Sequence, residues 1–241
     1  MRSLARVAPL AVLIAIIAAC GGPSRAGDDA YREAAAQAVR DAVLTLDDLP
    51  DGWTPSEIGP EALADLQLTG DCAPLNARGA GFPGEVASGD SEPMTGPSNE
   101  EMVNTVSAFT DIPAAKAAVR QADGQVLQCT DQIGEALKRA IQVGAKDIGV
   151  DDLITGIDAS LEPGSFSKFG DETLAYLLHA DISTFLAGGY DVNGKILIIR
   201  DGPLIGVLIY AILGDLDPQD ERSLAGFLAE KLARAEDSLS D

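Results

Sequence analysis

The segment that most constrains the fold is a pair of apolar runs, residues 195–200 ("KILIIR") and 204–213 ("LIGVLIYAIL"), joined through Asp201-Gly202. Asp-Gly is a preferred pair for the tight turn of a β-hairpin, because that turn needs positive φ angles that the two residues tolerate. We therefore predict that the two runs form neighbouring antiparallel strands. Both runs are apolar throughout rather than at alternate positions, which indicates that both faces of this part of the sheet are covered. Helices on both sides would explain the pattern, and so would an apolar pocket against one face.

Other segments predict further strands and helices. The expected strands or extended pieces are residues 85–88, 100–110, 152–162 and 172–183, and a short piece at Trp53. The expected helices are residues 28–45, 111–144 and 217–235. Gly124 divides the second helix, which we therefore expect in two pieces.

The second and third helices also carry signals for their ends and for their buried faces. Asp111 and Asp217 are suited to cap them, and Pro113 and Pro218 fall in the first turn, where proline is tolerated. In the second helix one face is formed by Val126, Cys129, Ile133, Leu137 and Ala140. In the last helix the apolar stripe is Leu224, Phe227, Leu228 and Leu232.

Strands that cluster in the sequence between flanking helices are typical of an α+β fold built on an antiparallel sheet. We predict a single α+β domain over residues 30–238, with a sheet of about five to six strands covered by helices.

The amino-terminal segment has the features of an export signal. Arg2 and Arg6 precede or flank an apolar run, residues 7–19, whose length of about a dozen residues is below the roughly 20 needed for a transmembrane helix. The run ends in "IAAC", which resembles the lipobox of bacterial lipoproteins, where the cysteine receives a lipid and the peptide is cleaved before it. We predict a lipoprotein signal peptide at residues 1–19 and lipidation at Cys20. An ordinary signal peptide with a chance cysteine is the alternative.

The segment after Cys20, "GGPSRAGDDA", is rich in glycine and small residues and predicts a flexible tether over residues 20–29. Two or more acyl chains, palmitate among them, anchor a protein stably to a membrane. We therefore expect membrane lipid as the partner of Cys20, a location on the extracytoplasmic face of the cell membrane, and no further crossing of it.

The remaining cysteines, Cys72 and Cys129, would lie in an oxidising compartment if the chain is exported. We predict a disulfide between them. Two free thiols or a metal site that uses the two cysteines are the alternatives.

The charge of the chain excludes one class of partner. There are 17 Lys and Arg against 38 Asp and Glu, a formal net charge of −21. Nucleic acid would be repelled by such a protein, so we expect no nucleic-acid partner. Hydrophobic residues make up 46% of the chain, which is enough for a buried core.

No motif supports an enzyme. The "GAGFPG" stretch, residues 79–84, has the letters of a dinucleotide fingerprint, but Pro83 lacks an amide hydrogen and no helix is expected after it. His179 is the only histidine, which rules out a two-histidine metal site, and no G-x-S-x-G motif presents a serine to it. Acidic residues gather at 47–51, 147–152 and 215–221, but none has the spacing of a calcium loop. We predict no catalytic, cofactor-binding or metal-ligating residue.

Spaced features over residues 44–235 resemble the extracellular sensor domain of mycobacterial PknH-type receptor kinases and related actinobacterial lipoproteins. They are "LTLDDLPDGWT", "VNTVSAFTDIPAAKAAVRQADGQVLQC", "FGDETLAYL" and the hairpin followed by the closing helix. The resemblance implies a helix-covered antiparallel sheet, disulfides and a cleft proposed to bind a ligand. The kinase domains have two cysteine pairs where this chain has one, and no ligand residue is carried over.

These observations lead to one main hypothesis and one alternative. The main hypothesis is a membrane-anchored lipoprotein with a non-enzymatic, sensor-like domain that binds a small or apolar ligand outside the cytoplasm. The alternative is an interaction or structural module that docks on another protein of the cell envelope.

Overall fold

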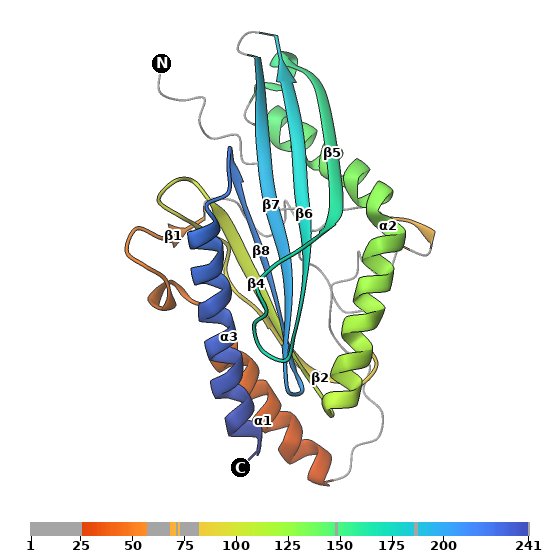
Figure 1. Ribbon diagram of the computed structural model, residues 1–241, viewed down its shortest axis with the longest axis vertical. Coiled ribbons are helices and arrows are strands. Elements are labelled where there is room, and N and C mark those ends of the chain that lie inside the picture. Colours follow the sequence, from red (N-terminus) through yellow and green to blue (C-terminus); the bar gives the residue numbers. More distant parts are fainter. Residues whose placement is uncertain are drawn as a thin grey trace.

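The computed structural model describes residues 26–56, 68–70, 72, 82–147, 149–185 and 188–240. It shows one antiparallel sheet with helices on both sides (Figure 1). The helices are α1 (Ala26–Ala42), α2 (Ile112–Asp147) and α3 (Pro218–Ser240), with short 3-10 turns η1 (Leu46–Asp48) and η4 (Asp151–Leu153). The strands are β1 (Thr54–Pro55), β2 (Glu85–Asp90), β3 (Met94–Thr95), β4 (Glu101–Phe109), β5 (Ile154–Gly164), β6 (Glu172–Thr184), β7 (Gly188–Asp201) and β8 (Leu204–Leu213). The predicted α+β class is confirmed.

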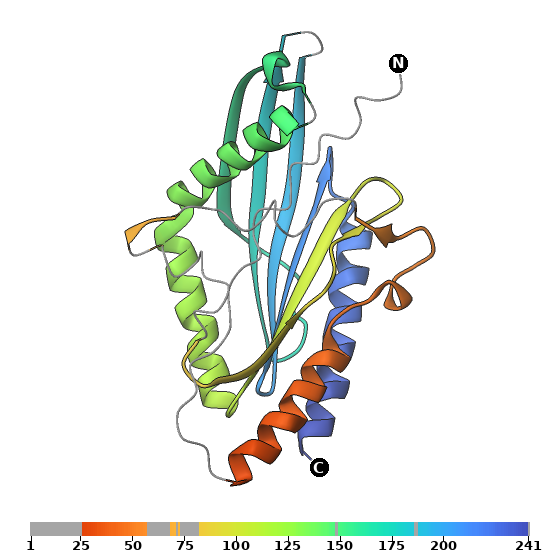
Figure 2. The same cartoon turned by 180° about the vertical axis from the view of Figure 1, so that it is seen from behind.

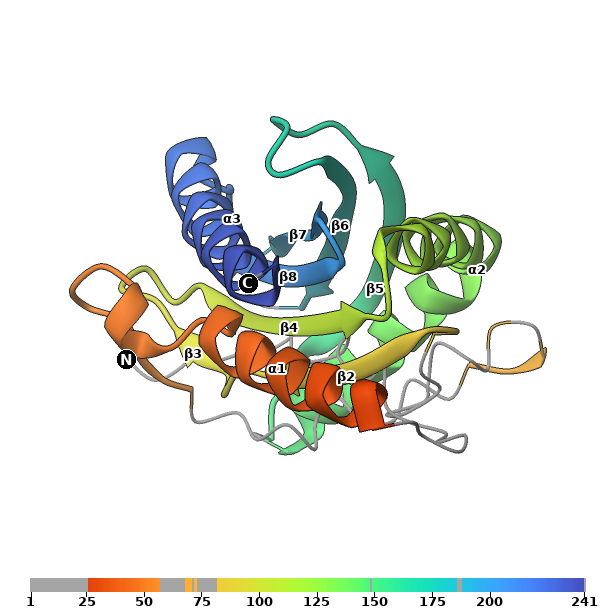
Figure 3. The same cartoon turned by 90° about the horizontal axis from the view of Figure 1, so that it is seen from below.

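The sheet follows the order β1-β3-β4-β8-β7-β6-β5, and β2 also pairs with β4. Its eight strands in the described part of the chain exceed the five to six that we predicted. β1 adjoins the short extended piece that we expected at Trp53, whereas β3 was not expected, because its two residues are too few to show a periodic pattern. The sheet is strongly curved, and β6 and β5 bend toward the side on which α3 lies (Figure 3).

The hairpin predicted from the two apolar runs is present. β7 pairs with β8 in antiparallel register as far as Asp201 and Leu204, and Gly202 in the turn has a φ of 52°. Gly206 in β8 lies under α3, where an added Cβ would come within 3.0 Å of the Leu228 and Leu232 side chains. A glycine at this position therefore lets helix and strand approach closely.

Helices cover both faces of the sheet, which accounts for the two-sided apolar strands. On one face α2 packs against residues such as Tyr176, Ile196, Ile205 and Ile209. On the other face α1 and α3, which lie side by side (Figures 1 and 2), pack against residues such as Val106, Leu197, Leu204 and Leu208. Of our two explanations for the apolar strands, helices on both sides is the one that the structure shows.

The second helix differs from our prediction, because it is continuous over 36 residues instead of being divided at Gly124. A Cβ added at Gly124 would meet nothing within 4 Å, so this glycine serves no close contact. The helix continues because residues on both sides of Gly124 bury the same face in the core, and tertiary packing outweighs the low helix propensity of one glycine.

The predicted amino-terminal caps of α2 and α3 are confirmed. The Asp111 carboxylate accepts a hydrogen bond from the Ala114 amide at 2.7 Å, and the Asp217 carboxylate accepts one from the Gln219 amide at 2.7 Å. The first helix begins at Ala26, so the last residues of the range that we assigned to the tether are helical. Cys20 and the signal peptide lie outside the described residues.

Among the described residues, none of the helices combines the length and apolar character that a membrane crossing requires.

Candidate functional site

One part of the sheet is not covered by a helix. α3 packs on β7 and β8, and beyond it the same side of β5, β6 and β7 carries mostly polar side chains. We call this surface the open face. Its residues are Asp158, Ser160, Glu162, Leu177, His179, Asp181, Asp191, Asn193 and Lys195.

The strand register arranges the open face in rows. Asp158, Asp181 and Asp191 are direct cross-strand partners on three neighbouring strands, so three carboxylates stand side by side. Like charges directly opposite one another destabilise a sheet. Lys138 of α2 reaches Asp158 at the sheet edge at 3.3 Å, which compensates only the outermost carboxylate.

Asp181 and Asp191 stand directly opposite each other on β6 and β7. Hydrogen bonding to the Asp181 carboxyl is the largest cause that raises the pKa of Asp191, followed by desolvation and by the charge of Asp181. Two carboxyl groups can share a hydrogen bond only when one of them is protonated. Protonation of Asp191, or a positive charge of a partner placed beside the pair, therefore relieves the repulsion between the two carboxylates.

His179 lies in the next row, at the centre of a hydrogen-bonded chain. Its Nδ1 is 2.8 Å from Asn193 Oδ1, and Asn193 Nδ2 donates to the Gly214 carbonyl at 2.7 Å. The Gly214 carbonyl fixes the orientation of the Asn193 amide, so Asn193 Oδ1 must accept a hydrogen bond from the Nδ1–H of the ring. Nε2 lies 3.2 Å from Asp181 Oδ2, a contact that is favourable only when Nε2 also carries a proton.

The surroundings of His179 therefore favour its charged form. The hydrogen bond with Asn193 is the largest cause that raises its pKa, and the charges of Asp181 and Asp191 act in the same direction against partial desolvation. Because both ring nitrogens are engaged, neither is available to take a proton from Ser160, which is the cross-strand partner of His179. The two contacts suit a protonated imidazole that forms an ion pair with Asp181, and they do not suit a catalytic base.

Lys195 lies at the end of the open face that is nearest the β7–β8 turn. Its Nζ forms an ion pair with Glu221 Oε2 at 2.7 Å and lies 5.1 Å from the centre of the Phe166 ring. The Lys195 and Glu221 side chains are 13% and 5% exposed, so the pair is shielded from solvent. Glu221 thereby neutralises the charge of Lys195, and the exposed part of the open face remains negatively charged.

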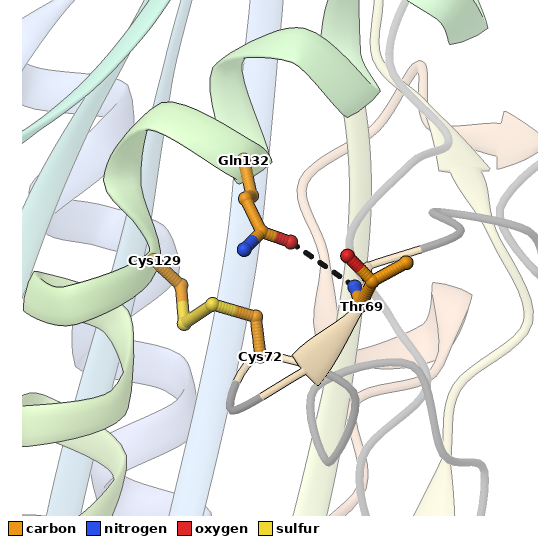
Figure 4. The surroundings of a disulfide bond; sticks show 4 residues. All are labelled: Thr69, Cys72, Cys129 and Gln132. Atoms are coloured by element: carbon orange, nitrogen blue, oxygen red, sulfur yellow. Dashed lines mark hydrogen bonds between the residues drawn. A yellow bond between two sulfur atoms is a disulfide. The ribbon is translucent and has the colours of Figure 1, made fainter.

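The predicted disulfide is present on the other side of the sheet. Cys72 and Cys129 are joined with an S–S distance of 2.05 Å, and beside them the Thr69 amide donates to Gln132 Oε1 at 3.0 Å (Figure 4). Cys129 is buried on the α2 face that we predicted, together with Val126, Ile133 and Leu137. The disulfide attaches the segment around Cys72 to the middle of α2.

The structure gives residues of two of the acidic clusters local roles. Asp48 forms an ion pair with Lys231 of α3 at 2.6 Å, and Asp217 caps α3. Residues 79–81 lie outside the described residues, and the chain after Gly84 continues as β2 and not as a helix. Over the described ranges, His, Cys, Asp and Glu side chains form no cluster of three or more that could hold a metal ion.

Sequence reasoning missed the residues that surround His179. The strand register brings Asn193 opposite His179 and places Lys195 at the end of the open face. The docking of α3 then brings Glu221 to Lys195. The alternation Asp191, Asn193, Lys195 in a strand that is otherwise apolar was the one available signal, because period-two polarity marks an exposed face.

Comparison with known proteins finds two similar solved structures. No protein-family model matches the chain, and no curated protein matches it. The chain is similar to the extracellular domain of PknH from Mycobacterium tuberculosis, with 12% identity, 83% of this chain and 97% of that chain covered, and a TM-score of 0.47. It is also similar to a protein from Mycobacterium smegmatis described as the Rv0999 ortholog, with 11% identity, 80% and 79% covered, and a TM-score of 0.28. The first of these two structures is of the kind that the sequence resembles, and no residue role or ligand is transferred from either.

Proposed function

We propose that this chain is an exported, lipid-anchored, non-enzymatic binding domain whose open face takes a basic segment of another protein of the cell envelope. The observation that carries the proposal is the row Asp158–Asp181–Asp191. A sheet that sets three carboxylates side by side gives up stability, and such violations of local rules are expected at functional sites.

The shape and charge of the open face support a polypeptide partner. It is a curved surface that spans three strands, with Leu177 41% exposed among the polar side chains. A lysine or arginine side chain would place its charge between Asp181 and Asp191, and an apolar side chain farther along the same segment would lie against Leu177. The apolar runs of β7 and β8 had suggested an apolar pocket, but helices on both faces of the sheet account for these runs, so they no longer favour an apolar ligand.

Export and anchoring are the other half of the proposal. They rest on the "IAAC" stretch that ends at Cys20 and on the Cys72–Cys129 disulfide, since disulfides persist in oxidising compartments. In the bacterium that produces it, the full chain should incorporate labelled palmitate and fractionate with membranes. Substitution Cys20→Ala should abolish the label, and retention of the label by that variant would refute the anchor at Cys20.

Calorimetry with tetralysine tests the binding proposal. We expect tetralysine to bind the domain and to bind at least about tenfold more weakly when both Asp181→Asn and Asp191→Asn are introduced. Affinity should fall steeply between low and physiological salt, because exposed charges are screened. The matched control is Glu230→Gln, which removes an exposed carboxylate from α3 whose contact with Arg234 is 4.0 Å long. Equal affinity for the double variant and the control would refute the open face as the binding surface.

A further inference from the structure

The open face is a strip three strands wide, and its side chains stand in rows across β5, β6 and β7. α3 lies beside this strip on the concave side of the curved sheet (Figure 3). Along β6, every second side chain points to the open face, so Asp181, His179 and Leu177 follow one another at intervals of about 7 Å. Asp181 and Leu177 are therefore about 13 Å apart along the strand.

The chemistry of the open face changes along β6 from charged to apolar. The first row of cross-strand partners consists of three carboxylates. The second consists of a hydroxyl, an imidazole and an amide, and the centre of the third is a leucine. In this order the rows are Asp158–Asp181–Asp191, Ser160–His179–Asn193 and Glu162–Leu177–Lys195.

Leu177 is the apolar member of the open face, and its neighbours leave it accessible. Its side chain is 41% exposed. On β5, a Cβ added at Gly164 would come within 2.9 Å of Leu177 Cγ, so the glycine leaves room for the leucine. On β7, Lys195 directs its Nζ to Glu221 at 2.7 Å and presents no free charge to Leu177. A single exposed leucine is common on a protein surface, but this one lies in line with the carboxylate pair on one strand.

A partner laid on this face is recognised through its side chains, because the backbone groups of β6 are engaged in the ladders with β5 and β7, in the plane of the sheet. A chain that runs across the strands meets a single row. Only a chain that runs along β6 reaches both Asp181 and Leu177. In an extended chain, residues four positions apart point to the same side and are about 13 Å apart, which is the interval on β6. In a helix, residues four positions apart are only about 6 Å apart along the axis.

We propose, building on the proposed function, that the open face selects an extended segment in which a lysine or arginine and a large apolar residue are four positions apart. The cation lies at Asp181 and Asp191, the residue two positions away faces the row of His179, and the apolar side chain packs on Leu177. An apolar residue three or five positions from the cation points away from the sheet, because side chains alternate along an extended chain. Affinity therefore depends on this spacing as well as on charge.

Two pentapeptides of identical composition test the spacing. Both are acetylated and amidated, so that the lysine carries the only charge: Lys-Thr-Ser-Thr-Leu has the spacing of four, and Lys-Thr-Ser-Leu-Thr has a spacing of three. The methyl signals of Leu177 are followed by ¹³C NMR while each peptide is titrated at low salt into the purified, oxidised protein. We expect the first peptide to bind about fivefold more tightly, because only its leucine is partly buried, and to shift the Leu177 signals more. Equal affinities, or no binding of either peptide, would overturn the proposal.

Two leucine variants locate the effect. Leu177→Ala should lower the affinity of the first peptide to that of the second. The matched control is Leu127→Ala, which truncates a leucine of α2 that is 45% exposed and should keep the fivefold difference. A difference that persists in Leu177→Ala, or that disappears in both variants, would overturn the assignment of the apolar position to Leu177.

A third variant separates a failure of this proposal from a failure of the proposed function. Asp181→Asn combined with Asp191→Asn should weaken the binding of both peptides, because it removes the carboxylates that meet the lysine. If the two peptides bind the wild type equally and both are weakened by this variant, the open face is the binding surface and the preferred spacing is wrong. If the variant leaves both affinities unchanged, the proposed function and the spacing are both wrong.

Discussion

The covered and the open parts of β7 differ within one strand. Toward the hairpin turn, Leu197 and Ile199 are buried under α1 and α3, whereas Asp191 and Asn193, on the same side of the strand, face solvent. The change occurs at Lys195, whose ion pair with Glu221 marks the end of the region that α3 covers. The comparison shows that the sheet has one region built for stability and another that gives up stability to hold charge.

The largest loss in the free energy of unfolding is expected when the disulfide on the covered α2 face is removed. Replacing both cysteines by serine removes the Cys72–Cys129 disulfide, which joins residues 57 positions apart. The chain-entropy model gives a loss of about 4 kcal/mol in the free energy of unfolding. Urea denaturation of the oxidised wild type and of the double variant measures it. Tetralysine affinity should not change, because the disulfide lies on the opposite side of the sheet from the open face.

Truncation under α3 should have the next largest effect. Leu228 is 0% exposed and packs against Gly206, so Leu228→Ala should lower the free energy of unfolding by about 3 kcal/mol. Leu177→Ala on the open face, where the side chain is 41% exposed, should cost less than about 1 kcal/mol. Equal losses in the free energy of unfolding for the two variants, measured by urea denaturation, would contradict the difference in packing between the covered and the open region.

A partly buried carboxyl group in β2 should make stability depend on pH. Burial is the main cause that raises the pKa of Glu85 to about 7, and its Oε1 has no partner among the described residues. Its folded pKa exceeds the unfolded value, so its stabilising contribution is complete below pH 4.5 and is lost as pH rises through 7.

The variant Glu85→Gln should therefore be more stable than the wild type at pH 8, by about 1 kcal/mol once the partial exposure of Glu85 is allowed for. The advantage should be absent at pH 4. Thermal denaturation at the two pH values measures the difference, and a constant difference across this range would contradict it.

The smallest effect is expected on the open face, and it should have the opposite sign to the truncations. Asp191→Asn removes one carboxylate of the repelling pair, so it should raise the melting temperature at pH 7. Because the folded pKa of Asp191 is raised, the penalty of the pair is absent below pH 3.8, its ordinary value, and grows as pH rises. A lower melting temperature for this variant at pH 7 would show that the pair stabilises the fold.

The covered region could be predicted from the sequence because its signals are local. The Asp201-Gly202 turn, the stripe that includes Leu224 and Leu228, and the cap at Asp217 each lie within a short window, and each was found where it was expected. The continuity of α2 through Gly124 was predicted wrongly, because packing of the whole helix decides it.

The open face could not be predicted because its residues meet only through register and docking. Asp158, Asp181 and Asp191 lie far apart in the chain and form a row only when three strands pair in one specific alignment. Asn104 lies between Met102 and Val106 on the buried face of β4, and its hydrogen bonds with Leu44 and Ser91 form only when segments distant in the sequence pack against that strand.

The single histidine of this chain lies in the middle of the open face and offers a unique reporter. We would follow the ring protons of His179 by NMR across a pH titration, with and without tetralysine, in the folded, oxidised domain. A basic segment bound at Asp181 and Asp191 would neutralise the charges that raise the pKa of His179, so the account predicts a lower His179 pKa in the presence of saturating tetralysine. A His179 titration that tetralysine leaves unchanged would contradict the open face as a binding surface.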